Sequence, residues 1–168
     1  MEKTGSQEKG TILIAEDDFD DRLLLEMAFC AFENSCEIRF VLDGEELMEY
    51  LNHRGPYEDP RTSPRPELIL LDLNMPKKNG HQALLEIRDD PLLKEIPVAI
   101  WTTSRSEKDM LFCRNIGADQ FLTKPSSFAD VVAAVKMLTA LYADPEFSQK
   151  APLPPEGETP NIAKASPT

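Results

Sequence analysis

The chain has 168 residues, which suits one folded domain with tails rather than two full cores. Its formal net charge of −12 argues against nucleic acid and anionic membrane surfaces as partners, because both attract clustered Lys and Arg. No apolar run approaches the roughly 20 residues of a membrane span, so we expect a cytoplasmic protein. The three cysteines (Cys30, Cys36, Cys113) include no CxxC pair, and we expect them to be reduced thiols.

The first part of the chain alternates predicted strands with predicted helices. Residues 11–15 are a short apolar run, typical of a strand buried on both faces, and the run stops at Glu16-Asp17-Asp18. Residues 19–32 have helical periodicity. Residues 36–41 alternate apolar and polar side chains as an edge strand does, and a helix then opens at Asp43-Gly44.

The alternation continues after a Pro-rich segment, residues 53–66, that predicts a long loop. Strands are predicted at 68–71, 96–101 and 119–123. Helices are predicted after the turn at 75–80, over 107–116 and from Ser127 to about Tyr142. We expect residues 1–10 to be flexible. The Pro-rich tail, residues 144–168, has too few apolar side chains to hold itself folded, so we expect it to be disordered.

Five strand–helix units in this order predict an α/β fold, a doubly wound parallel sheet with helices on both faces. Ligands of such sheets bind at the carboxyl ends of the strands. The residues at those ends are Glu16, Asp17, Asp72, Thr102 and Lys124. The fold therefore predicts that three carboxylates, one hydroxyl and one ammonium group converge at one edge of the sheet.

These residue types suit the transfer of a phosphoryl group to a carboxylate. Three neighbouring carboxylates repel one another unless a cation lies between them, and Mg²⁺ binds one or two carboxylates together with phosphate oxygens. Asp72 can act as the nucleophile and form an aspartyl phosphate. Mg²⁺, the Lys124 ammonium and the Thr102 hydroxyl would neutralise the phosphoryl oxygens, so the reaction requires no general base.

Four runs at the strand ends resemble response-regulator receiver domains: Ile-Ala-Glu-Asp-Asp, Leu-Ile-Leu-Leu-Asp-Leu-Asn-Met-Pro-Lys-Lys-Asn-Gly, Trp-Thr-Thr-Ser and Phe-Leu-Thr-Lys-Pro-Ser. The resemblance covers residues 11–143. It implies a flavodoxin-like (βα)5 fold with strand order 2-1-3-4-5, and Asp72 as the phosphorylated residue. It also implies an Mg²⁺ site made by Glu16, Asp17, Asp72 and the backbone carbonyl of Asn74.

The same resemblance assigns roles at the last two strands. Thr102 and Lys124 would act with Asp72 in catalysis, and Thr102 and Phe121 would form the switch that responds to phosphorylation. The peptide bond between Lys124 and Pro125 would be cis. We expect phosphorylation to draw Thr102 inward and to let Phe121 rotate into the space beneath the fourth helix.

The long Pro-rich loop and the Asp-Leu-Asn-Met-Pro-Lys-Lys run are similar to single-domain regulators that partner bacterial phytochrome kinases. This similarity implies a sensor histidine kinase, of the phytochrome class, as the phosphoryl donor. It also implies a homodimer through the face of the fourth helix, fifth strand and fifth helix, which includes Phe112, Phe121, Phe128 and Val132. With no further domain after Tyr142, we expect output by protein contact rather than by an enzymatic activity.

Two other functions remain open. A phosphatase of the haloacid-dehalogenase type also uses a strand-end Asp with Mg²⁺, but it requires a second Asp two positions later, where this chain has Asn74. A pseudo-receiver scaffold is disfavoured because every required side chain is present. Asp18 and Asp20 are explained by the dipole of the helix that follows them, and His53 and His81 are expected to be surface residues.

Overall fold

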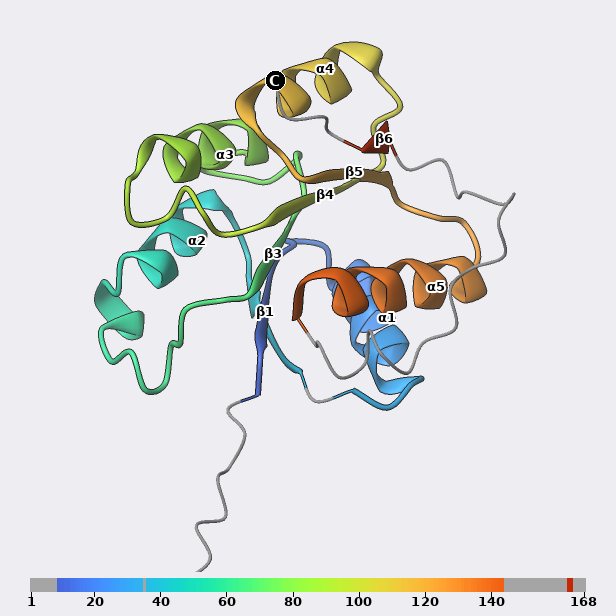
Figure 1. The fold of residues 1–168 in the computed structure, drawn as a ribbon, viewed down its shortest axis with the longest axis horizontal. Helices are drawn as coiled ribbons and strands as arrows, with labels where there is room; N and C mark the ends of the chain where they lie inside the picture. Colours follow the sequence, from blue (N-terminus) through green and yellow to red (C-terminus); the bar gives the residue numbers. More distant parts are fainter. Residues whose placement is uncertain (1–8, 35, 144–162, 165–168) are drawn as a thin grey trace, which may run out of the picture.

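The computed structural model describes residues 9–34 and 36–143 and the backbone of residues 163 and 164. The strands are β1 (Thr11–Ala15), β2 (Glu37–Val41), β3 (Leu68–Leu71), β4 (Val98–Thr102), β5 (Gln120–Thr123) and β6 (Ala163–Lys164). The helices are α1 (Phe19–Cys30), α2 (Gly44–Leu51), α3 (Gly80–Asp89), α4 (Glu107–Ile116) and α5 (Phe128–Leu138), with a 3-10 turn, η1 (Gly55–Tyr57), and a π-helical segment, η2 (Thr139–Ala143). The predicted alternation of strands and helices is confirmed (Figure 1).

The strands form one sheet in the order β2-β1-β3-β4-β5-β6, and the first five are parallel. This is the predicted flavodoxin-like arrangement, 2-1-3-4-5, with one strand added. Helices α2, α3 and α4 cover one face of the sheet, and α1 and α5 cover the other (Figure 1). Strand β2 lies at an edge, as its alternating sequence predicted.

The strand side chains divide into two cores according to the face toward which they point. Leu13, Ile69 and Ile100 pack with α2, α3 and α4, whereas Ile12, Leu70 and Trp101 pack with α1 and α5. Because successive side chains of a strand point to opposite faces, a strand covered on both faces must be apolar throughout. This explains why β1, β3 and β4, whose residues are all buried, are apolar except for Thr11 and Thr102 at strand ends.

The sixth strand was not predicted. Within the tail expected to be disordered, residues 144–162 and 165–168 lie outside the described residues, as do residues 1–8 of the predicted flexible N-terminus. Ala163–Lys164 pairs antiparallel with β5, with Ala163 opposite Phe121. A strand there occupies the edge that a five-stranded sheet would leave open, and open edges tend to pair with other chains.

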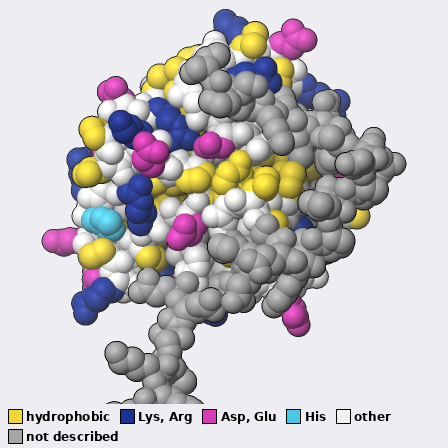
Figure 2. Space-filling view, in the orientation of Figure 1, with side chains coloured by type: hydrophobic (Ala, Val, Ile, Leu, Met, Phe, Trp, Pro, Cys, Tyr) yellow, Lys and Arg dark blue, Asp and Glu magenta, His cyan; other side chains and the backbone are white. Residues whose placement is uncertain are grey.

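The surface carries charges of both signs. On the face shown in Figure 2, Lys and Arg side chains are interspersed with Asp and Glu, and hydrophobic side chains gather in a band across the middle. Among the helices of residues 9–34 and 36–143, none has the length and apolar character needed to cross a membrane.

Candidate functional site

The predicted carboxylates meet at the carboxyl ends of β1 and β3. These two strands are neighbours, with Ala15 opposite Leu71, so the residues that follow them also lie side by side. One oxygen from each of Glu16, Asp17 and Asp72 lies within 4.8 Å of the others. The structure therefore confirms the predicted convergence of these three residues.

The three carboxylates differ in their access to solvent. Glu16 is 1% exposed and Asp72 is 5% exposed, whereas Asp17 is exposed. Two buried negative charges and a third beside them repel one another, and a bound cation would relieve that repulsion. Since the donors are all oxygen atoms, the set fits a hard divalent cation such as Mg²⁺ or Mn²⁺.

Lys124 neutralises part of this charge from the end of β5. Its Nζ lies 2.7 Å from Glu16 Oε2, 2.8 Å from Asp21 Oδ2 and 3.2 Å from Asp72 Oδ2. Burial alone would lower the pKa of the ammonium, but the hydrogen bonds to Asp21 and Glu16 outweigh it and raise that pKa. Lys124 therefore stays charged beside Asp72.

Asp21 is a site residue that the sequence did not reveal. It lies in the first turn of α1 and is one of three carboxylates that bind the Lys124 ammonium. Its position four residues after Asp17, about one helical turn, was the available signal, but only Asp18 and Asp20 were considered there, and both were attributed to the helix dipole. Asp18, by contrast, is the N-cap of α1, and its side chain accepts a hydrogen bond from Asp21 N, which accounts for its position without a metal.

Burial raises the pKa of Glu16 to about 7, with the hydrogen bond from Lys124 opposing this change and the charge of Asp72 adding to it. One carboxylate oxygen accepts hydrogen bonds from Asp18 N (3.1 Å) and the other from Lys124 Nζ (2.7 Å). Below about pH 7 the Glu16 carboxyl thus retains a proton that a bound cation would displace.

The peptide bond between Lys124 and Pro125 is trans, as are all peptide bonds in the part of the chain that the structure describes, so the predicted cis bond is wrong. Lys124 N donates to Thr102 O at 2.7 Å, which holds the end of β5 against β4. From this position the ammonium reaches the carboxylates with the trans bond in place. The cis form, less stable by about 0.5–1 kcal/mol, is therefore not needed to orient the lysine.

The loop after Asp72 is held closely against that residue. Asn74 is exposed, and its N–H donates to Asp72 Oδ1 at 3.2 Å; metal binding by its carbonyl stays a prediction. Gly80, the first residue of α3, lies so near that a Cβ built there would be 2.2 Å from Asp72 O. Only glycine allows α3 to begin directly on the backbone of Asp72.

The two predicted switch residues occupy the neighbouring strand ends. Thr102 is fully buried, and its Oγ1 accepts a hydrogen bond from Ser104 N at 3.1 Å. Phe121 is 8% exposed and packs in the core beneath α2, α3 and α4. In this structure Phe121 is buried, and its inward rotation on phosphorylation stays a prediction.

The histidines differ from the simple surface residues that were expected. His53 Nε2 lies 2.9 Å from Ser63 O, and His81 Nε2 lies 3.1 Å from Asp109 Oδ1. The His81 side chain is 27% exposed and links α3 to α4. The sequence contained no signal for this contact, because the two residues are 28 positions apart.

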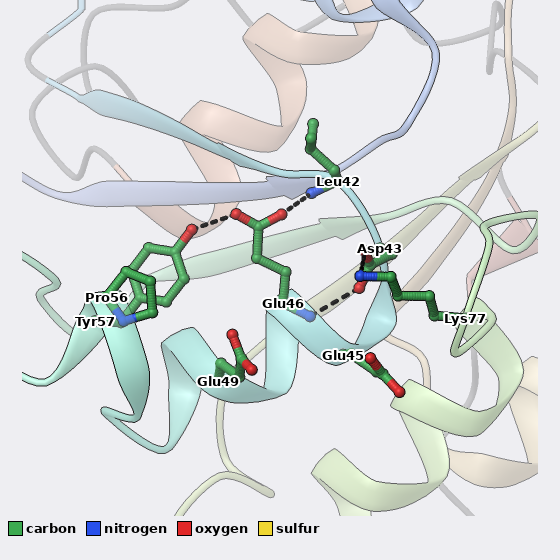
Figure 3. Close-up of a pocket in the computed structure, with 8 residues that line it drawn as sticks. All are labelled: Leu42, Asp43, Glu45, Glu46, Glu49, Pro56, Tyr57 and Lys77. Atoms are coloured by element: carbon green, nitrogen blue, oxygen red, sulfur yellow. Dashed lines mark hydrogen bonds and ion pairs between the residues drawn. The ribbon is translucent and has the colours of Figure 1, made fainter.

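A separate hollow of about 270 Å³ lies between the end of β2, α2, η1 and the loop before α3 (Figure 3). Its lining includes four carboxylates, but Glu46 already accepts hydrogen bonds from Leu42 N and the Tyr57 hydroxyl, and Asp43 caps α2 (Figure 3). None of the carboxylates around Lys124 lines it. The hollow is therefore separate from the cluster of strand-end residues around Asp72.

Comparison with known proteins gives a consistent family. Residues 12–136 match the family model of the response regulator receiver domain. The chain is 36% identical over 133 residues to the response regulator Rcp1 of Synechocystis sp., covering 79% of this chain and 88% of Rcp1. The crystal structure of Mn²⁺-bound Rcp1 superposes with a TM-score of 0.72 at 34% identity, covering 86% of this chain and 99% of that one.

Two further solved structures are similar. The phosphorylated cyanobacterial phytochrome response regulator RcpA has a TM-score of 0.74 at 34% identity, over 87% of this chain and 99% of that one. The response regulator RPA3017, in red light signalling of R. palustris, has a TM-score of 0.75 at 34% identity, over 86% and 98%. The family match, the parallel sheet and the clustered strand-end residues lead to one conclusion: the chain belongs to the response regulator receiver family.

Proposed function

We propose that this protein is a phosphorelay receiver that accepts a phosphoryl group on Asp72 from a sensor histidine kinase. The observation that carries the proposal is the position of Asp72, with Lys124 Nζ at 3.2 Å and the carboxylates of Glu16 and Asp17 beside it. A carboxylate between an ammonium group and a divalent-cation site is arranged to attack phosphorus rather than carbon, since the charges lie where phosphoryl oxygens would be.

In the proposed reaction an Asp72 carboxylate oxygen forms a bond to phosphorus while the P–N bond of the donor's phosphohistidine breaks. The electron pair of that bond returns to the imidazole nitrogen of the donor, so no general base is needed on this chain. Lys124 stays protonated and exchanges its bond with Asp72 for one with a phosphoryl oxygen. Thr102 donates its hydroxyl hydrogen to another phosphoryl oxygen.

Mg²⁺ is the proposed cofactor, held by Glu16, Asp17, Asp72 and the carbonyl of Asn74, and when bound it neutralises phosphoryl charge. Support comes from the all-oxygen donor set and from the relative Rcp1, whose structure was solved with Mn²⁺. Glu16 and Asp72 are buried, whereas Asp17 is exposed and so offers the cation a route from solvent.

We propose a phytochrome-class kinase as the donor because RcpA is a phytochrome response regulator and RPA3017 acts in red light signalling. Output would follow by protein contact, without turnover of a separate substrate, and homodimers would form through α4, β5 and α5. That face carries the exposed Phe128 and the half-buried Phe112 and Val132, and β6 borders it.

The test is phosphotransfer from a panel of purified, autophosphorylated histidine kinases that includes phytochromes. We expect Mg²⁺-dependent transfer to the wild type, fastest from a phytochrome, and none to Asp72→Asn. Transfer that survives in Asp72→Asn would refute the assignment of the acceptor. Transfer from every kinase class at the same rate would refute the phytochrome partnership alone.

A further inference from the structure

Ser104 connects the Thr102 hydroxyl to the start of α4. Its backbone N–H donates to Thr102 Oγ1 at 3.1 Å, and its own hydroxyl donates to Asp109 Oδ2 at 2.6 Å. Ser104 Oγ also accepts a hydrogen bond from Ser106 N at 3.2 Å. One residue of the loop between β4 and α4 thus joins the switch hydroxyl to the first turn of the helix.

Asp109 extends this connection to α3. Its second oxygen lies 3.1 Å from His81 Nε2, and the His81 ring packs edge-on against Phe112, with 5.2 Å between the ring centroids. Hydrogen bonds from Ser104 and His81 hold the pKa of Asp109 below its usual value, so the side chain is a carboxylate. Because a carboxylate only accepts hydrogen bonds, the contact assigns a proton to Nε2 of His81.

These contacts oppose the movement that the proposed function requires of Thr102. We expect the Thr102 side chain to move toward a phosphoryl oxygen on Asp72, and its hydroxyl can donate to that oxygen while still accepting from Ser104 N only if Ser104 follows it. Ser104 must then either lose this hydrogen bond or move with the threonine. Moving means breaking its hydrogen bond to Asp109, which is itself held to α3.

We propose that Ser104, Asp109 and His81 form a latch that holds the loop between β4 and α4 in its resting position and thereby limits access of Thr102 to the phosphoryl group. The proposal rests on the proposed function. Asp109 and His81 act through Thr102 and are positioning residues. Phe112 lies beside His81 on α4, so opening the latch would also change the face proposed for protein contact.

The latch has a measurable thermodynamic consequence. A ligand that binds only the open state has an apparent Kd equal to its intrinsic Kd divided by the open fraction. Removing the latch raises that fraction and tightens binding. Because the Asp109 side chain is partly exposed, a lost hydrogen bond should count as one of ordinary net strength, which would tighten the apparent Kd roughly 5- to 10-fold.

The probe is beryllofluoride with Mg²⁺, which mimics the phosphoryl group on an aspartate, added to the full chain. The single tryptophan, Trp101, is buried next to Thr102 and reports binding through its fluorescence. We expect tighter binding in Asp109→Ala and in His81→Phe, which keeps a ring against Phe112 but has no Nε2–H to donate. Asp109→Asn can still accept from Ser104 and hydrogen-bond to His81, so it should stay within about twofold of the wild type.

The matched control is Glu107→Ala, which also removes an acidic residue from the first turn of α4, at an exposed position, and should stay within about twofold of the wild type. If Asp109→Ala does not fold, His81→Phe makes the same test. Unchanged or weaker binding in the folded variants, with a normal wild-type response, would overturn the latch but leave the proposed function intact. No response in the wild type, together with no phosphorylation by acetyl phosphate, would overturn both.

Discussion

The raised pKa of Glu16 makes folding stability depend on pH in a direction that can be tested. The carboxyl group has an ordinary pKa of 4.5, and in the folded protein burial raises it to about 7. Between these two values the folded state holds a proton that the unfolded state has lost. The free energy of unfolding must therefore fall as pH rises through this window, and it levels off above about pH 7.

The size of the effect follows from the same two values. Each unit of pKa corresponds to about 1.4 kcal/mol, so the full displacement sets an upper limit of roughly 3–4 kcal/mol. A bound divalent cation requires ionised Glu16 and so removes this loss of stability. The stabilisation by saturating Mg²⁺ should accordingly be larger at pH 8 than at pH 5, by roughly 1–3 kcal/mol.

The assay is urea unfolding of the wild type and of Glu16→Gln from pH 5 to pH 8, with and without Mg²⁺. The glutamine of this variant can still accept the hydrogen bond from Asp18 N but cannot titrate, so the difference between the two proteins isolates the Glu16 contribution. Without metal, the wild type should lose stability relative to the variant as pH rises. A difference that stays constant over this range would refute the raised pKa and the proton-displacement account.

Three further predictions concern metal binding, packing and the sheet edge. A hundredfold excess of Mg²⁺ over its Kd should stabilise the wild type by about 2.7 kcal/mol in thermal unfolding, and Asp17→Asn should show no such gain; equal gains would exclude Asp17 as a ligand. Gly80→Ala should destabilise the protein and slow phosphorylation, because the new Cβ meets Asp72 O. The control Gly55→Ala, at a positive φ with open space around it, should cost about 1 kcal/mol of stability and leave the phosphorylation rate unchanged. Equal phosphorylation rates in the two variants would refute the packing argument. Ala163→Pro removes a backbone N–H from β6 and should increase self-association through the freed β5 edge, measured by sedimentation; unchanged association would show that β6 does not protect that edge.

The sheet and most of the site could be predicted from the sequence because they depend on local signals. Apolar runs that stop abruptly at Glu16, Asp72 and Thr102 mark buried strands and their carboxyl ends, and parallel pairing then places those ends together. The Gly44 and Gly80 positions, where helices begin, also coincide with turns that the sequence marked. Local pattern and overall topology agree at these places.

The residues that sequence reasoning missed interact across long separations. Asp21 meets Lys124 from 103 positions away, and its place in a helix start had a sufficient local explanation. His81 meets Asp109 only because α3 and α4 pack side by side, which no spacing within either helix reveals. The pairing of Ala163 with Phe121 depends on an open sheet edge, and that edge exists only once the fold is formed.

The most direct test of the account identifies the residue that accepts the phosphoryl group. The protein is treated with acetyl phosphate and Mg²⁺ and then with borohydride, which reduces an acyl phosphate to an alcohol and so converts the modified aspartate to homoserine. Peptide mass spectrometry should find homoserine at position 72 alone, and only when Mg²⁺ is present. Homoserine at Asp17 or Asp21, or none at all in the folded wild type, would contradict the assignment of Asp72 as the phosphoryl acceptor.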